Sequence, residues 1–205
     1  VKVTMKDAVS GLDEPRTLRV IDWDTAHNND WLAVQQLAVQ GPLYKCIPDV
    51  VLFVNGLPLV IIELKKPGVP DKEGFAENLT SYKHEQNGAP RLFAFNAMLI
   101  TSNGTASHIG SLTADWERFF EWKRVEREDE PRRVSLEVLL RGTCDPGRLL
   151  DMVNNFTLFS QAGSGLGKII GQNHQYLGVN NAITATLAAR AAGHGRAGVF
   201  WQTQG

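Results

Sequence analysis

Residues 47–67 constrain this chain more than any other stretch, because charged residues interrupt two segments that otherwise favour burial. Asp49 precedes an apolar run, a turn follows, and a second run of Leu, Val and Ile leads into Glu63 and Lys65. Side chains in a strand alternate between faces, so Glu63 and Lys65 point to the same side. Burying either charge alone is costly. The pattern therefore predicts a β-hairpin whose charges are paired with each other or with a bound cation.

The register of this hairpin decides whether Asp49 reaches Glu63. A strict two-residue loop at Asn55-Gly56 would place Asp49 opposite Ile62, on the wrong face of the sheet. A three-residue loop, with Gly56 in the left-handed conformation as a bulge, shifts the register by one residue. Asp49 then shares a face with Glu63. We therefore predict the three-residue loop.

Two neighbouring carboxylates suit a hard divalent cation, typically Mg²⁺ that keeps several of its waters. Such an ion polarises a phosphoryl oxygen and lowers the pKa of a bound water. A nearby lysine steadies the attacking water or the developing negative charge. Asp49 and Glu63 are thus the predicted metal ligands, and together with Lys65 they are the predicted catalytic residues for phosphodiester hydrolysis. The alternative is a solvated hairpin in which Glu63 and Lys65 form a surface ion pair.

Residues 48–68 read PDVVLFVNGLPLVIIELKKPG. This text resembles the PD-(D/E)xK nuclease motif and, more specifically, the restriction (R, motor and nuclease) subunit of type I restriction-modification enzymes. The resemblance covers roughly residues 28–205. It implies an ATP-dependent, site-specific deoxyribonuclease that uses Mg²⁺ and acts on double-stranded DNA together with methylation and specificity subunits. The alternatives are a repair or mobile-element nuclease with the same motif, and a non-catalytic module that docks DNA or another subunit.

A helix of about 15 residues is predicted after residue 68, because Phe75, Leu79 and Tyr82 recur at helical spacing. Within it, Asn78 and Tyr82 resemble the Gln-x-x-x-Tyr motif of the family, with Asn in place of Gln. The resemblance implies that both residues support the site or contact a phosphate. Asn keeps the donor and acceptor groups of Gln on a shorter side chain. Core packing is the alternative role of Tyr82.

The order of strands, a crossover helix and further strands predicts an α/β fold, with a mixed central sheet flanked by helices. The β-prone run at 90–101 and the segment to residue 111 predict a second hairpin. Residues 114–123 predict an aromatic-rich helix. Residues 135–140 and 145–154 predict two further helices, the second with an Asp N-cap followed by Pro. The resemblance implies a restriction-endonuclease-like core.

We predict two regions, an endonuclease domain over residues 1–155 and a linker with the start of a RecA-like ATPase or translocase domain over residues 156–205. The glycine-rich run at 162–169 has Ile where a phosphate-binding loop requires Ser or Thr. A flexible hinge is the preferred interpretation of that run.

The segment from residue 172 onwards resembles the opening of the first RecA-like domain of superfamily-two helicases. In that comparison Gln175 matches the glutamine that reads adenine, and Thr203 and Gly205 lie in the first part of the Walker A loop. The second half of the loop is absent from the sequence, so the ATP site is partial. An ordinary polar position at a helix start is the alternative for Gln175. Residues 199–201 predict a buried strand.

The net charge of the chain limits how it can bind DNA. The net charge is −1, so binding requires local basic patches or partner subunits. The run from Lys123 to Arg133 holds five basic and four acidic residues, which predicts a mixed-sign connector.

The two cysteines and five histidines lack zinc-site spacing. Neither a membrane-spanning run nor a signal peptide is recognisable, so we expect a cytoplasmic protein without membrane contact. The opening residues predict a fragment of a longer subunit.

Overall fold

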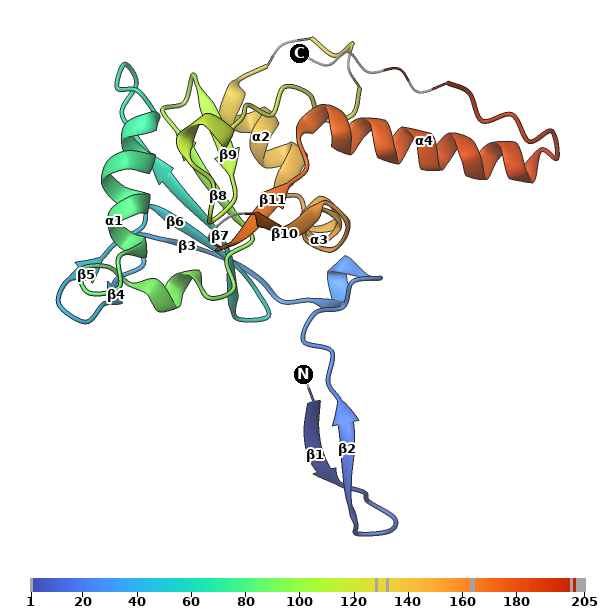
Figure 1. The fold of residues 1–205 in the computed structure, drawn as a ribbon, viewed down its shortest axis with the longest axis horizontal. Helices are drawn as coiled ribbons and strands as arrows, with labels where there is room; N and C mark the ends of the chain where they lie inside the picture. Colours follow the sequence, from blue (N-terminus) through green and yellow to red (C-terminus); the bar gives the residue numbers. More distant parts are fainter. Residues whose placement is uncertain (1, 128, 132, 163–164, 200, 202–205) are drawn as a thin grey trace.

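The computed structural model describes residues 2–127, 129–131, 133–162, 165–199 and 201. At its centre is a five-stranded sheet in the order β3-β6-β7-β8-β9 (Figure 1). β7 and β8 are parallel, and the other neighbours are antiparallel. The predicted mixed central sheet is thus confirmed. Its strands are β3 (Trp31–Gln35), β6 (Val50–Val54), β7 (Leu57–Leu64), β8 (Met98–Ser102) and β9 (Ser107–Gly110).

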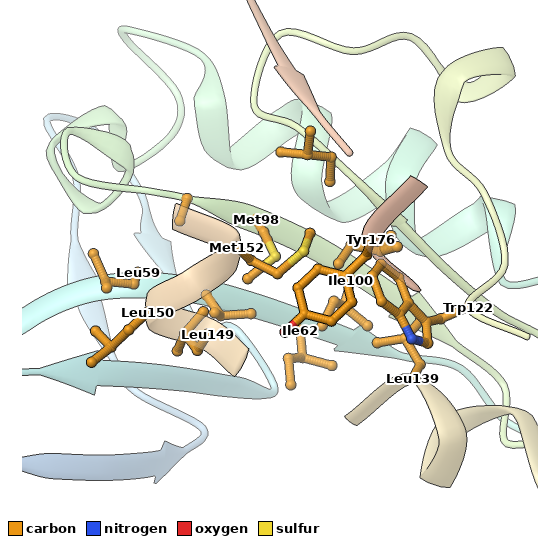
Figure 2. Packing of buried hydrophobic residues seen from close by; sticks show 14 of the residues in the cluster. Leu59, Ile62, Met98, Ile100, Trp122, Leu139, Leu149, Leu150, Met152 and Tyr176 are labelled. Atoms are coloured by element: carbon orange, nitrogen blue, oxygen red, sulfur yellow. The ribbon is translucent and has the colours of Figure 1, made fainter. Parts of the chain in front are cut away.

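Strand β7 is the middle strand of the sheet, and residues 59–63 are all buried. A run of Leu, Val and Ile is what a strand covered on both faces requires. One face packs against α2 (Ser135–Thr143), α3 (Pro146–Asn155) and the start of α4 (Asn173–Ala191), with side chains such as Ile62, Leu149 and Trp122 (Figure 2). The opposite face carries the candidate site.

That opposite face is covered by a helical segment at residues 72–83. It comprises a π-helical stretch at Gly74–Leu79 and the short helix α1 (Thr80–Lys83). Leu79 packs on the sheet with Val51, Ile61 and Leu99 in a second core. The predicted helix therefore exists, but it is shorter than expected and ends near His84, where the backbone becomes extended.

Both helices predicted after the connector are confirmed. Asp145 accepts hydrogen bonds from the backbone N–H groups of Gly147 and Arg148, and Pro146 occupies the first turn of α3. This capping satisfies donors that the helix itself leaves unpaired. Of the helices that the structure describes, none is both long and apolar enough to cross a bilayer.

Three small hairpins lie outside the central sheet in the described part of the chain. β1 (Lys2–Lys6) pairs with β2 (Asp13–Thr17) and extends away from the main body (Figure 1), while β4 (Val39–Gln40) pairs with β5 (Lys45–Cys46). β10 (Thr157–Ala162) pairs with β11 (Gly165–Ile170). The predicted glycine-rich hinge is therefore wrong, since most of that run is strand. Hydrogen bonds between Lys168 and the side chains of Ser111 and Thr113 hold β11 against the core.

The run at 90–101 is not one strand. Its first part is a 3₁₀ helix at Pro90–Phe93, because proline fixes a backbone angle suited to a first turn. The strand begins only at Met98. The following turn leads into β9, with Ser102 opposite Ser107, so the second hairpin is confirmed.

The aromatic-rich helix predicted at 114–123 is also wrong. Only a 3₁₀ turn forms, at Trp116–Arg118. Phe120 then bridges Ile109 at the edge of the sheet. Phe119 lies directly against Gly110, where even a Cβ atom would approach the ring to 2.4 Å. Tertiary packing of the aromatic rings thus overrides their helical spacing.

The segment after Gln172 forms the helix α4, which ends two residues before Gly193. Beyond it, Val199 and Trp201 are exposed and belong to no strand, in contrast to the buried strand predicted there. Phe200 and residues 202–205 lie outside the described part of the chain. The start of a RecA-like domain is not visible in the described residues.

Candidate active site

The loop of the central hairpin has two residues. Val54 pairs with Leu57, and both Asn55 (φ 50°) and Gly56 (φ 79°) adopt positive φ. Positive φ at both positions is the signature of a type I′ turn, whose twist suits two-residue hairpins. The Asn55 side chain accepts a hydrogen bond from the Asp30 N–H at 2.7 Å, which holds the turn in place. The predicted three-residue loop is therefore wrong.

The shift in register arises inside the strand instead. Leu52 pairs with Val60, but Phe53 pairs with Pro58, so Leu59 is an extra residue on β7. Pro58 has no N–H to donate to the ladder, and proline is tolerated in sheets mainly at edges and bulges. The resulting bulge supplies the one-residue shift that the loop does not.

Beyond the bulge, Val50 pairs with Ile62, and extending this register by one residue places Asp49 opposite Glu63. Asp49 therefore lies on the predicted face of the sheet. Its Oδ2 accepts a hydrogen bond from the Leu64 N–H at 2.7 Å, which fixes the carboxylate beside the end of β7.

Glu63 is buried, with only 1% of its surface exposed, and its Oε1 has no hydrogen-bond partner among the described residues. Burial raises its pKa to about 8, and the neighbouring charge of Asp49 contributes in the same direction. Gly74 lies over Glu63, because a Cβ there would be 3.4 Å from the Glu63 Cβ. The site thus contains a buried carboxyl group, one oxygen of which has no hydrogen-bond partner among the described residues.

Lys65 lies at the end of β7 and contacts the covering helical segment. Its Nζ is 3.0 Å from both Glu77 Oε2 and Asn78 Oδ1. Asn78 Nδ2 then donates to the Tyr82 hydroxyl at 3.2 Å. That hydroxyl donates in turn to the carbonyl of Ile47 at 3.3 Å. The two predicted supporting residues therefore join Lys65 to the segment that begins the motif.

Tyr82 fits both roles that the sequence left open. It also packs against the second core, and burial is the main cause of its raised pKa. Asn78 reaches the lysine and the tyrosine directly despite its shorter side chain, without a bridging group.

A polar row continues across the sheet from Glu63, and sequence reasoning missed it. Thr101 on β8 lies opposite Glu63, and His108 on β9 lies opposite Thr101. Both contact Asp71, which is 5% exposed: His108 Nδ1 is 2.6 Å from Asp71 Oδ2, and Thr101 Oγ1 donates to the same oxygen at 3.2 Å. These contacts anchor the start of the segment that covers Glu63. The sequence signal was one polar residue in each of two β-prone segments, Thr101 and His108. These residues are seen to lie in one row with Glu63 only when the pairing of the strands is known.

The donor set fits a hard divalent cation. Asp49 and Glu63 offer carboxylate oxygens side by side, and one buried oxygen of Glu63 lacks a partner. Among the described residues there is no group of three or more His, Cys, Asp or Glu placed to hold a metal ion. The rest of a coordination shell would therefore come from water, backbone or substrate oxygens, as Mg²⁺ commonly accepts.

Of the residues predicted for ATP, Gln175 lies within the described part of the chain. Gln175 Oε1 accepts a hydrogen bond from the Gln172 N–H at 2.8 Å, and the two side chains form a capping box at the start of α4. The ordinary helix-start role thus accounts for its contacts. Thr203 and Gly205 lie outside the described residues.

Comparison with known proteins places the chain in a family. The family model described as "Type I restriction enzyme R protein N terminus" matches residues 1–118. The endonuclease subunit of the type I restriction enzyme HindI from Haemophilus influenzae is 36% identical over 96% of the chain. A putative type I restriction enzyme endonuclease subunit, MjaIXP of Methanocaldococcus jannaschii, is 26% identical over 100% of the chain.

The chain spans only about a fifth of the length of these relatives, 19% and 21% respectively. The match nevertheless covers the central sheet, the hairpin with Asp49 and Glu63, and the covering helical segment. The chain therefore belongs to the family of type I restriction enzyme R proteins and corresponds to their N-terminal region.

Proposed function

We propose that this chain is the DNA-cleaving module of a type I restriction enzyme and hydrolyses phosphodiester bonds with Mg²⁺ held by Asp49 and Glu63. The observation that carries the proposal is the buried Glu63, whose unpartnered oxygen lies beside Asp49 with Lys65 two residues on. Such a costly arrangement is expected where function requires it, because a core strand gains nothing from a buried carboxyl oxygen without a hydrogen-bond partner.

The site residues have different roles in the proposed reaction. Bound Mg²⁺ would supply Lewis-acid stabilisation and a more acidic water. Lys65 stabilises negative charge near the scissile phosphate, and its contacts with Glu77 and Asn78 hold the ammonium group in position. Tyr82 and Asn78 tie the helical segment to the residue before Pro48-Asp49.

The names of the relatives, all endonuclease subunits of type I restriction enzymes, extend the proposal to the full-length protein. We propose that it binds ATP and double-stranded DNA and works in the cytoplasm with methylation and specificity subunits. The partial match of Gln175, Thr203 and Gly205 to an ATP site belongs to this wider proposal.

Asp49→Ala in the full-length protein tests the function. We expect DNA cleavage to fall by about 10³-fold or more, as is usual when a metal-binding catalytic residue is removed. ATP hydrolysis should continue, because the nuclease and motor sites are separate in this proposal. Cleavage of unmodified DNA and ATP turnover are measured in the same reaction.

The matched control is Asp13→Ala, which removes the same charge from the exposed outer hairpin. It should cleave like the wild type. If Asp49→Ala also cleaves at the wild-type rate, the nuclease assignment is wrong, and a docking role for this module is the better explanation.

A further inference from the structure

A pocket with three basic residues lies on the other face of the sheet, between the connector and α2. Its volume is about 350 Å³, and Lys123, Arg124 and Arg133 line it. Thr105 and Ser135 add hydroxyl groups, and Glu121 is the one carboxylate among the lining residues that the structure describes. The described lining is therefore net positive and rich in hydrogen-bond donors, which suits a phosphate group.

Most of the acidic residues that the structure describes in the connector are occupied elsewhere. Glu130 accepts hydrogen bonds from the backbone N–H groups of Val125, Glu126 and Arg127. Asp129 pairs with Arg127 at 2.8 Å. Among the described residues of the connector, Asp129 and Glu130 thus make these contacts within the loop, whereas Lys123, Arg124 and Arg133 line the pocket.

Two acidic residues of the connector, Glu126 and Glu130, interact with arginine side chains. Glu126 pairs with Arg148 of α3 at 2.7 Å, away from the pocket. Glu130 is close enough to Arg133 for the two charges to interact, so the positive field of the pocket is reduced but not cancelled. Glu128 and Arg132 lie outside the described residues.

The backbone beneath the basic side chains is held rigidly. Asn173, which is 8% exposed, accepts hydrogen bonds from the N–H groups of Lys123 (3.2 Å) and Arg124 (3.0 Å). Its Nδ2 donates to the Arg124 carbonyl at 2.9 Å. A fixed backbone lowers the entropy cost of holding a ligand.

The pocket also lies at the end of the sheet that carries the candidate site. Thr105 belongs to the turn between β8 and β9, and β8 ends at Ser102, whose carbonyl accepts the Lys65 N–H at 2.8 Å. DNA that reaches Lys65 on one face therefore passes the same sheet end as the pocket on the other. A chain with a net charge of −1 needs such a local basic surface to hold DNA.

We propose that this pocket binds a phosphate group, with Lys123 and Arg133 as its main ligands, and that the phosphate belongs to the DNA strand engaged by the nuclease site. The DNA assignment rests on the proposed function, whereas phosphate binding itself does not. The triphosphate of a nucleotide shares the same chemistry and is the other source to be distinguished.

The test is equilibrium binding of a short DNA duplex to the full-length protein at several salt concentrations, without divalent cations so that no cleavage occurs. Lys123→Ala combined with Arg133→Ala should weaken binding about tenfold or more and make the salt dependence shallower by about one unit per lost phosphate contact. The single variant Arg133→Lys should recover most of the affinity lost in Arg133→Ala.

Arg127→Ala is the matched control, because it removes one arginine from the same connector, where Arg127 is paired with Asp129. Its DNA affinity and salt slope should stay near those of the wild type. If Arg133→Ala and Arg127→Ala behave alike, the phosphate-binding proposal is overturned.

A second arm measures binding of a fluorescent nucleoside triphosphate without DNA. Unchanged triphosphate binding in the double variant, with weakened DNA binding, supports the DNA assignment. Weakened triphosphate binding with unchanged DNA binding overturns the DNA assignment. Asp49→Ala separates this proposal from the nuclease function, because it should bind duplex DNA as the wild type does even though it does not cleave.

Discussion

Glu63→Gln is expected to abolish DNA cleavage and yet to yield a protein more stable than the wild type at alkaline pH. Cleavage should fall by about 10³-fold or more, because an amide cannot replace an anionic metal ligand. The fold should persist, since the glutamine amide has nearly the shape of the protonated carboxyl group that the buried site favours below pH 8.

The stability change has a defined sign. The pKa of Glu63 is raised from 4.5 in its ordinary state to about 8 in the fold. Between these values the folded protein keeps a proton that the unfolded chain has lost, so wild-type stability falls as pH rises through that window. Each full pH unit costs at most about 1.4 kcal/mol, so the window from 4.5 to about 8 limits the total loss to about 5 kcal/mol.

The measurement is urea unfolding with a chelator at about pH 5 and about pH 9, where the two sides of this window are sampled. Glu63→Gln should be more stable than the wild type only at the higher pH. Glu77→Gln is the control, because its carboxylate is largely exposed. An equal pH dependence in Glu63→Gln and the wild type would show that Glu63 is not a buried, proton-holding group.

Lys65→Met is expected to lower the cleavage rate at saturating DNA by about 10²–10³-fold, the usual effect of losing one group that stabilises transition-state charge. Methionine keeps much of the aliphatic stem and removes only the ammonium group. Its effect on stability should stay below about 1 kcal/mol, because the partner Glu77 is exposed. Single-turnover cleavage and DNA binding are measured together.

Lys66→Met is the matched control for this variant. Lys66 is the next residue along the chain, is exposed, and carries the same charge. It should cleave DNA nearly as the wild type does. If both lysine variants lose cleavage equally, the effect reflects general DNA attraction and not a role of Lys65 in the reaction.

The local sequence pattern predicted those strands and helix starts that are determined by neighbouring residues. Alternation placed Glu63 and Lys65 at the end of a buried strand, and the Asp145-Pro146 pair predicted the start of α3. The pairing of β6 with β7 requires one extra residue to bring Asp49 to the face of Glu63, and the sequence pattern predicted that residue in the loop. Pro58, the second residue of β7, was the overlooked cue, because proline interrupts the ladder where the bulge forms.

Long-range packing explains what the sequence did not reveal. Phe119 and Trp116 repeat at helical spacing, but their rings stack near the sheet edge with centroids 5.5 Å apart, and no long helix forms. The contact between Asp71 and His108 joins residues 37 positions apart. The parallel pairing of β7 with β8 places Thr101, which contacts Asp71, opposite Glu63, and no local periodicity encodes that pairing.

Calorimetric titration of Mg²⁺ without nucleotide or DNA tests whether Asp49 and Glu63 together hold a divalent cation. Because Glu63 holds a proton up to about pH 8, Mg²⁺ binding at neutral pH should release about one proton and should tighten as pH rises. Glu63→Gln and Asp49→Asn should both lose this binding. Undiminished Mg²⁺ affinity and proton release in Glu63→Gln would show that Glu63 is not a metal ligand.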